Sequence, residues 1–338
     1  MNLLITGATG FIGLAFCQRL FNDPTLDFQT VYATIRDCTK SNSLPSEVKP
    51  LLVNSLQDWR ELFSSLPQID SVIHLAACVH QKTQHPDEMY KLINTDYTTA
   101  LAQAAAKNHV KRFIYVSTVK VIGEGNCESE TCLPYDESTP PRPTDAYGLS
   151  KWNAEQALID TAVTSELEVV ILRPPLVYGP GVKANFLRLA QLAQSGLPLP
   201  LGAIQNKRSL IYVENLIDAM LTCITHPQAA NKTFLVSDGQ DLSTPDLIKK
   251  IAVATGYPCR LFSVPPAVME LAGICGDALG KALGLPLPIS SETLTKLTGS
   301  LTVDGSKICH DLGWHPPFTV EAALAKTFEK SFGNQTAK

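Results

Sequence analysis

The glycine-rich turn near the start of the chain constrains the fold more than any other sequence feature. The apolar run Leu3-Leu4-Ile5 leads into Thr6-Gly7-Ala8-Thr9-Gly10-Phe11-Ile12-Gly13, where a helical stretch begins. The first two glycines allow a tight turn and a close approach of the backbone to a pyrophosphate, and the third allows the helix to pack closely on the strand. Free backbone N–H groups at the start of such a helix attract phosphate. The turn therefore predicts a dinucleotide-binding strand–turn–helix unit.

Short β-branched runs alternate with helical stretches through the first half of the chain, which indicates a parallel sheet covered by helices. The runs are apolar on both faces, as expected when helices cover a sheet from two sides. The predicted strands are Asn2–Thr6, Val31–Ile35, Leu51–Val53, Val72–Leu75, Arg112–Ser117 and Val169–Leu172. The predicted helices are Phe11–Phe21, Asp58–Leu66, Asp87–Asn108 and Ala146–Thr164. The predicted fold class is therefore α/β, a Rossmann-type doubly wound parallel sheet.

The second half of the chain has a different rhythm. Prolines become frequent after Arg173-Pro174-Pro175 and helices predominate, which predicts a smaller, helix-rich substrate-binding lobe. We assign residues 1–175 to the dinucleotide-binding domain, and residues 176–207 and 237–333 to the lobe. Residues 208–236 are expected to return to the first domain, where Leu210–Val213 and Thr233–Val236 would join the main sheet.

Charge and cysteine content exclude several classes of protein. The chain has 28 Lys and Arg residues against 32 Asp and Glu, a net charge of −4, and no basic stripe, so a nucleic-acid surface is not expected. Its nine cysteines are scattered and never spaced C-x-x-C. We therefore expect reduced thiols and no metal site.

The most apolar stretch of the second half, from Val264 to Pro288, is interrupted by Glu270, Asp277, several prolines and several glycines. A membrane span needs about 20 mostly apolar residues, so we expect an amphipathic helix that packs inside the protein instead. The first residues lack the charged and long apolar segments of a signal peptide. We expect no membrane span and a cytoplasmic location.

Further segments, in a fixed order, resemble the extended short-chain dehydrogenase/reductase family. They are His74-Leu75-Ala76-Ala77, Tyr147-Gly148-Leu149-Ser150-Lys151, the run from Arg173 to Pro180, and Asp304-Gly305-Ser306-Lys307 followed by Leu312-Gly313-Trp314. The resemblance covers essentially the whole chain and implies an NAD-dependent epimerase/dehydratase type of enzyme. With the glycine-rich turn, it implies a cofactor site formed by Gly7, Thr9, Gly10, Phe11, Ile12, Gly13, Arg36, Leu75, Ala76, Ala77, Tyr147, Lys151 and Pro174.

The predicted catalytic residues are Thr118, Tyr147 and Lys151. Tyr147 and Lys151 are four residues apart, so they share one face of a helix. A nearby ammonium group stabilises a phenolate and lowers the pKa of a tyrosine, which would let Tyr147 exchange a proton with a sugar hydroxyl. By resemblance to the family's S-S/T-x-x-V-Y-G segment, Thr118 is the hydroxyl that hydrogen-bonds the reacting oxygen.

The end of the second strand bears on the choice of nicotinamide cofactor. In this fold an acidic residue there binds the ribose 2′-hydroxyl of NAD, whereas a nearby arginine suits the 2′-phosphate of NADP. The chain has Ile35 at the acidic position, followed by Arg36 and Asp37. A guanidinium group binds phosphate through two hydrogen bonds, so NADP(H) is favoured. NAD(H) remains possible, because Asp37 can turn inward or pair with Arg36.

Two departures from related enzymes bear on the reaction. Sugar-nucleotide 4,6-dehydratases carry Asp-Glu directly after the threonine for the elimination, whereas this chain carries Val119 and Lys120, which disfavours dehydration. Leu176 stands where typical galactose-type epimerases and dehydratases have an asparagine that contacts the nucleotide. That difference weakens assignment to the UDP-glucose 4-epimerases.

The resemblance implies a nucleotide-activated hexose as substrate, most simply a UDP-linked one, with reaction at carbon 4. Arg208 is predicted to grip the diphosphate. The predicted substrate-binding residues are His80, Lys120, Asn185 and Arg208. Of these, His80 and Lys120 are equally compatible with solvent-exposed positions, and Asn185 can take part of the role of the missing asparagine.

Two reactions at carbon 4 remain open. The segment around Val119-Lys120 resembles bacterial 4-reductases of UDP-4-keto-6-deoxy-N-acetylhexosamines, which supply sugars for surface polysaccharides such as the lipopolysaccharide O-antigen, and Arg36 favours the same NADPH-dependent reaction. The alternative is a UDP-glucose or UDP-N-acetylglucosamine 4-epimerase. A cofactor-sensing scaffold without activity is disfavoured, because Thr118, Tyr147 and Lys151 are all present.

A homodimer is also expected. In the family, two equivalent helices of each subunit form a four-helix bundle across a two-fold axis, and such dimers are the commonest assembly. Here the corresponding stretches, Asp87–Asn108 and Ala146–Thr164, carry small side chains that allow close packing: Ala100, Ala102, Ala104, Ala105, Ala154 and Ala157. The alternative is that these alanines pack only against the protein's own sheet.

Overall fold

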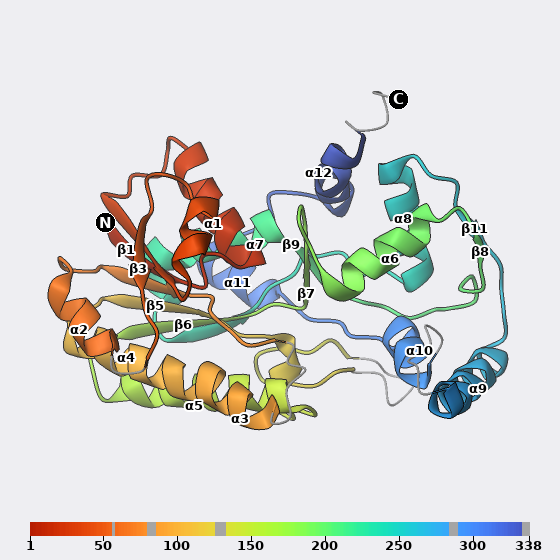
Figure 1. Cartoon of the computed structure of the whole chain (residues 1–338), viewed down its shortest axis with the longest axis horizontal. Coiled ribbons are helices and arrows are strands. Elements are labelled where there is room, and N and C mark those ends of the chain that lie inside the picture. Colours follow the sequence, from red (N-terminus) through yellow and green to blue (C-terminus); the bar gives the residue numbers. More distant parts are fainter. Residues whose placement is uncertain (56–57, 80–85, 126–132, 284–289, 333–338) are drawn as a thin grey trace.

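The computed structural model describes residues 1–55, 58–79, 86–125, 133–283 and 290–332. Seven strands in these ranges form one sheet in the order β10-β6-β5-β4-β1-β2-β3, in which every neighbouring pair is parallel (Figure 1). The strands are β1 (Asn2–Thr6), β2 (Thr30–Ile35), β3 (Lys49–Leu52), β4 (Ser71–His74), β5 (Arg112–Val116), β6 (Glu168–Arg173) and β10 (Lys232–Leu235). The predicted α/β doubly wound parallel sheet is confirmed.

Helices cover both faces of this sheet (Figure 1). Those of the dinucleotide-binding half are α1 (Phe11–Asn22), α2 (Asp58–Ser65), α3 (Pro86–Tyr90), α4 (Tyr97–Lys107), α5 (Ala146–Val163) and α7 (Val213–Thr225). Alternate side chains of β1 enter two separate cores: Leu3 and Ile5 pack with residues of α1 and α7, and Leu4 packs with residues of α2, α4 and α5. From β1 the chain adds β2 and β3 on one side, and then adds β4, β5 and β6 on the other side. This reversal opens a crevice at the carboxyl ends of β1 and β4.

The predicted helix Asp87–Asn108 is divided into three parts. A π-helical turn, η2 (Lys91–Asp96), separates α3 from α4. A turn of this kind carries one extra residue and is frequent at functional sites. Here it turns the side chain of Asn94 into the interior, where it is 1% exposed.

The segment predicted to return to the main sheet does so only in part. β10 lies at the edge of the sheet beside β6, where Thr233–Val236 was expected. The prediction for Leu210–Val213 was wrong: β9 (Leu210–Tyr212) pairs with β7 (Leu176–Tyr178) in a separate two-stranded sheet. Its three residues are buried there, in the same core as residues of α6, α7 and α8.

The second lobe lies to the right in Figure 1 and consists mainly of helices. Its elements are α6 (Ala184–Gln194), β8 (Pro198–Leu199), α8 (Thr244–Thr255), β11 (Arg260–Leu261), α9 (Pro266–Leu283), α10 (Ser291–Thr298) and α12 (Val320–Phe332). α11 (Ser306–Leu312), which was expected in this lobe, packs instead against β10 at the edge of the main sheet. Short 3-10 turns occur at η1 (Cys38–Ser43), η3 (Val119–Val121) and η4 (Pro227–Ala229). The helix ends follow local capping rules: α8 begins at the Ser243 cap with Pro245 in its first turn and ends at Gly256, whose φ is +71°.

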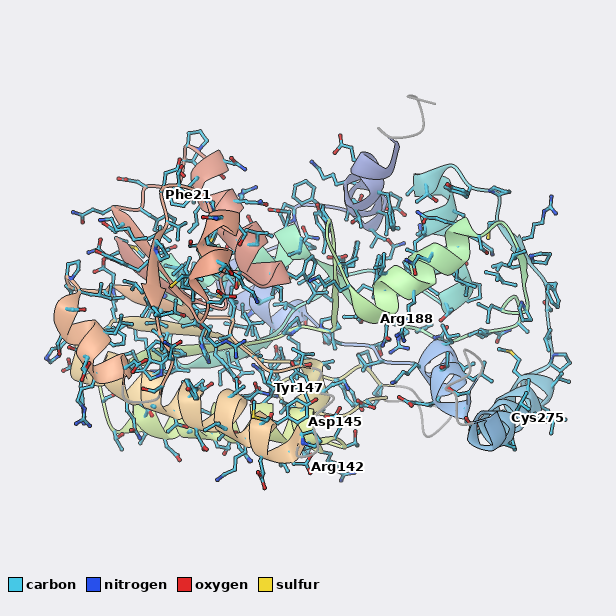
Figure 2. All side chains as sticks on the ribbon, in the orientation of Figure 1. Phe21, Arg142, Asp145, Tyr147, Arg188 and Cys275 are labelled. Carbon is cyan, nitrogen blue, oxygen red and sulfur yellow. The ribbon has the colours of Figure 1, made fainter. Side chains whose placement is uncertain are left out.

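The prediction that the stretch from Val264 to Pro288 packs inside the protein was wrong for its described part, and residues 284–288 lie outside the described residues. Residues 266–283 form α9, which contacts α10 along the side where Met269 is buried. Its other side exposes large apolar side chains, and Figure 2 shows Cys275 on this outer side. The exposed set is Val268, Leu271 and Leu279, each at least half exposed. Ile274 is also exposed, but it lines a cavity between α9 and α10. None of the described helices is both long enough and apolar enough to cross a membrane.

Candidate active site

The glycine-rich turn connects β1 to α1, as predicted. Gly7 has a φ of +71°, and a Cβ atom there would lie 2.6 Å from the backbone nitrogen of Ala76. A Cβ atom on Gly13 would overlap the carbonyl oxygen of Gly7. These two glycines are therefore required by the protein's own backbone, which brings the turn against the chain that leaves β4. Gly10 differs, because a Cβ atom there would meet only the Gly7 oxygen, at 3.1 Å.

The start of α1 has the properties of a phosphate site. Gly10 is the N-cap and supplies no side-chain hydrogen bond. In the described chain, the backbone N–H groups of Phe11, Ile12 and Gly13 have no acceptor, while the Leu14 N–H donates to Gly10 at 2.9 Å. A helix of twelve residues places partial positive charge at these groups. They and the open side of Gly10 fit the pyrophosphate of a dinucleotide.

Several loops meet at this edge of the sheet. The Leu75 N–H donates to the carbonyl of Thr6 at 3.1 Å, and the Ala76 N–H donates to the Thr6 hydroxyl at 3.3 Å. On the other side, the Val119 N–H donates to the carbonyl of Pro174 at 3.0 Å. The loops that carry the predicted cofactor residues Leu75, Ala76, Ala77 and Pro174 therefore lie at the carboxyl ends of β4 and β6, where doubly wound sheets bind their ligands.

The end of β2 presents Arg36 to solvent. Ile35 before it is buried, and no described residue pairs with the Arg36 guanidinium. The Asp37 carboxylate turns away and accepts from the N–H and the hydroxyl of Thr39, at 2.9 and 2.7 Å. These hydrogen bonds hold the pKa of Asp37 below its usual value. Asp37 is therefore engaged in capping η1, and it does not pair with Arg36.

Tyr147 and Lys151 lie one turn apart on the first part of α5. Asp145 caps this helix, and its carboxylate accepts from the Gly148 N–H at 2.6 Å. Lys151 is 1% exposed; its ammonium donates to the Val116 carbonyl at 2.8 Å and lies 4.0 Å from the centre of the Tyr115 ring. Burial lowers the pKa of Lys151 to about 7.

The electrostatics of Tyr147 differ from the sequence-based expectation. Burial raises the pKa of the Tyr147 phenol, and the neighbouring Asp145, Tyr90 and Cys78 raise it further. Lys151 does not offset this shift, because its ammonium points to Val116 and not to the phenol. The chain by itself thus holds Tyr147 as a protonated phenol, and a positive charge near its oxygen is required before it can act as a base.

Thr118 follows β5 and caps the short turn η3. It is partly exposed, and its hydroxyl accepts from the Lys120 N–H at 3.3 Å. α5 packs directly on this turn, since a Cβ atom on Gly148 would lie 2.8 Å from the Lys120 carbonyl oxygen. The packing of Gly148 on η3 brings the helix of Tyr147 and Lys151 against the segment that carries Thr118.

The predicted substrate-binding residues have different surroundings. The ammonium of Lys120 pairs with the carboxylates of Glu124 and Asp145. The Arg208 guanidinium is partly buried and donates to the Lys296 carbonyl at the end of α10, and Asn185 is exposed near the start of α6. His80 lies outside the described residues. The structure therefore leaves the substrate contacts of all four as predictions.

Sequence reasoning missed two buried polar residues that support the site. Asn94, in the π-helical turn, bonds both backbone groups of Cys78 at 2.7 and 3.0 Å and donates to Ser150 at 2.9 Å. It thus ties the loop after β4 to α5, the helix that carries Tyr147 and Lys151. No sequence signal distinguishes Asn94, because it stands beside other polar residues, Thr95 and Asp96.

His74 is the second missed residue. Its Nδ1 lies 2.6 Å from the Thr6 hydroxyl and its Nε2 lies 2.7 Å from the Thr98 hydroxyl. Thr98 uses its own proton on the Asn94 carbonyl, so Nε2 donates and Nδ1 accepts from Thr6. Burial lowers the pKa of His74 to about 3, which keeps the ring neutral. The ring stacks on Tyr115, the ring beneath Lys151.

The described residues contain no group of three or more His, Cys, Asp or Glu side chains able to hold a metal ion. Seven cysteines in those ranges carry free thiols.

Comparisons with known proteins agree with this geometry. Residues 3–237 match the NAD dependent epimerase/dehydratase family. A UDP-glucose 4-epimerase of Vibrio cholerae is 40% identical over 96% of this chain and 94% of its own. An N-acetyl-α-D-glucosaminyl-diphospho-ditrans,octacis-undecaprenol 4-epimerase of Escherichia coli O157:H7 is 27% identical over 98% of this chain and 95% of its own.

Solved structures have the same fold. A UDP-glucuronic acid 4-epimerase from Bacillus cereus in complex with NAD has a TM-score of 0.73 at 21% identity and covers both chains completely. A UDP-glucose 4-epimerase from Thermotoga maritima with UDP-glucose has a TM-score of 0.73 at 22% identity, over 99% of each chain. The match to the family over more than half of the chain and the 40% identical relative lead to one conclusion. This chain belongs to the NAD dependent epimerase/dehydratase family.

Proposed function

We propose that the protein is a 4-epimerase of a nucleotide-linked hexose and keeps NAD bound through its catalytic cycle. The observation that carries the proposal is the meeting of the open phosphate turn at Gly10 with the helix of Tyr147 and Lys151 at one edge of the sheet. The 40% identical relative, a UDP-glucose 4-epimerase, supports the same reaction.

The residues would divide the work as follows. Tyr147 would take the proton of the carbon-4 hydroxyl and return it after the sugar has turned, while the Thr118 hydroxyl would hydrogen-bond the same oxygen. Lys151 would bind the nicotinamide ribose. The bound cofactor would accept and return the hydride at carbon 4, so there is no net oxidation.

The substrate is proposed to be UDP-linked. The two relatives differ in the carrier of the sugar, which is UDP in one and undecaprenyl diphosphate in the other, but both carriers join the sugar through a diphosphate. Arg208 is our candidate for that group, because its guanidinium already lies in the lobe at the end of α10. Binding would require it to leave the Lys296 carbonyl.

A 4-keto reductase that uses NADPH is the second candidate. The unpaired, exposed Arg36 at the end of β2 favours it, because a guanidinium in this place can bind a 2′-phosphate. Two observations oppose it. A solved structure of the same fold holds NAD, and the 40% identical relative is a UDP-glucose 4-epimerase. Neither supports a preference for NADP.

The cofactor released from freshly purified, denatured protein tests the proposal. We expect NAD in near-stoichiometric amount, and conversion of UDP-glucose or UDP-N-acetylglucosamine to the carbon-4 epimer without added cofactor. Arg36→Ala is then expected to change activity less than about two-fold, as is the matched surface variant Arg260→Ala. Protein that lacks NAD, oxidises NADPH with a UDP-4-keto sugar, and loses ten- to hundredfold affinity for NADPH on Arg36→Ala would establish the reductase instead.

A homodimer remains a proposal, although four of the six alanines expected at its interface are not available to it. Ala102, Ala104, Ala105 and Ala154 are buried in the protein's own core, so they are not available to a partner. α5 does expose Leu149, Ile159 and Val163, the last of them 80% exposed. We expect light scattering at micromolar concentration to give twice the chain mass of 36.7 kDa, and Ile159→Glu with Val163→Glu to give the monomer mass. A monomer for the unmodified chain would contradict the dimer.

A further inference from the structure

Lys120 lies between two carboxylates next to the catalytic helix. Its ammonium is 2.8 Å from Asp145 Oδ2 and also pairs with Glu124, one turn further along the chain. The Lys120 side chain is 37% exposed and that of Asp145 is 38% exposed, so the pair lies at the rim of the site and not in the core. Its ammonium is therefore engaged by two carboxylates of the protein itself.

Asp145 links Lys120 to Tyr147. Its Oδ2 pairs with Lys120, while its Oδ1 accepts the Gly148 N–H at the first turn of α5. Tyr147 stands two residues after Asp145, and Figure 2 shows the two side chains beside each other where the helix begins. The same first turn rests on the Lys120 backbone through Gly148. Lys120 therefore holds the start of the catalytic helix through both its side chain and its backbone.

We propose that Lys120 is a positioning residue that fixes Asp145 and offsets its negative charge beside Tyr147, and thereby sets the pH at which the phenol exchanges its proton. The proposal rests on the proposed function in one respect, that Tyr147 is the acid–base group. It replaces the predicted contact of Lys120 with substrate.

Lys120 is the cation that forms an ion pair with Asp145 among the described residues around Tyr147. Tyr90 of α3 packs edge-on against the Tyr147 ring with 6.1 Å between ring centres, and Cys78 faces it from the loop after β4. Tyr115 of β5 is a further neighbour of Tyr147, and the Lys151 ammonium lies over the Tyr115 ring. Asp145, Tyr90 and Cys78 each disfavour the phenolate, and each acts in addition to burial. Loss of the Lys120 charge would leave the Asp145 carboxylate unopposed and raise the pKa of Tyr147 further.

A charge cycle of three variants tests this inference. Lys120→Met is expected to move the acid limb of the kcat profile up by about 0.5–1 pH unit, which lowers the rate at a fixed pH on that limb about three- to tenfold. Asp145→Asn keeps a good helix cap and is expected to move the limb down. The double variant is expected to return close to the unmodified profile. Lys250→Met is the matched control, because Lys250 also pairs with a carboxylate, Glu321, but between α8 and α12.

A direct titration of Tyr147 separates this inference from the proposed function. NMR of protein labelled with ¹³C at the tyrosine ring, assigned with Tyr147→Phe, reads the phenol whether or not a substrate is turned over. The same order of pKa values is expected, with Lys120→Met highest and Asp145→Asn lowest, and smaller differences at 1 M KCl. Identical titrations in Lys120→Met and the unmodified protein would overturn the inference. A raised KM with an unchanged pH profile would also overturn it, and would return Lys120 to substrate binding.

Discussion

Tyr147→Phe is expected to lower kcat by about 10²–10⁴-fold, the usual contribution of a general acid–base group, and to leave the amount of bound cofactor near that of the unmodified protein. Only the hydroxyl is removed, and the ring keeps its packing against Tyr90. The phosphate turn is built by residues of β1 and α1 and does not contain Tyr147. Turnover and released NAD, measured on the same preparation, check both expectations.

Tyr90→Phe is the matched control for this prediction. Tyr90 contacts the Tyr147 ring from the neighbouring helix, and its own hydroxyl donates to the Val79 carbonyl at 3.1 Å, so it is engaged away from the site. We expect its removal to change kcat only a few-fold. Equal losses in the two variants would mean that removal of a hydroxyl from either ring disturbs the site, and would contradict a specific proton transfer by Tyr147.

Most of the sheet was predictable because its signals are local. β1 and the turn to α1 are specified by consecutive residues, and β1 agrees with its predicted range, Asn2–Thr6. A strand that is buried on both faces is also recognisable from its unbroken apolar run. The cap of α5 at Asp145 and the cap of α8 at Ser243 follow the same local rules.

The errors arise where the outcome depends on contacts between distant segments. Leu210–Tyr212 has the apolar pattern of a main-sheet strand, but the position next to β6 is taken by β10, and β9 pairs with β7 instead. The sequence of α9 has an apolar side, which predicts that this side is buried, yet α9 packs mainly on α10. The pattern of apolar residues indicates that a face is apolar, but it does not indicate which element of the fold lies near enough to cover that face.

The candidate site shows the same division between local and distant information. The spacing of Tyr147 and Lys151 placed them correctly on one helical face, because that follows from the helix repeat. Their electrostatic relation did not follow, because Lys151 is bound by the carbonyl of Val116 on β5, which is 35 residues away in the sequence. His74 and Asn94 were missed for the same reason, since their partners come from β1, α4 and α5.

Lys151→Met is expected to abolish turnover and at the same time to stabilise the cofactor-free protein. The pKa of Lys151 falls from 10.5 to about 7 in the fold, so between these values the unfolded chain binds a proton that the folded chain does not. The free energy of unfolding of the unmodified protein therefore rises with pH across this window, and the penalty for the buried charge is fully present below pH 7. A methionine of similar length carries no such penalty.

The size and the pH dependence of this effect distinguish it from ordinary repacking. The fall of the pKa from 10.5 to about 7 corresponds to roughly 5 kcal/mol, and loss of the hydrogen bond to Val116 offsets about 1–2 kcal/mol of it. We expect Tm at pH 6 to rise by about 4–8 °C in Lys151→Met, and the difference to shrink towards pH 10, because the folded lysine is neutral there and the unfolded lysine begins to lose its proton. Lys111→Met, at an exposed lysine just before β5, should show neither effect. A Lys151→Met protein that is less stable at every pH would mean that the ammonium stabilises the fold through Val116 and the Tyr115 ring by more than its burial opposes it.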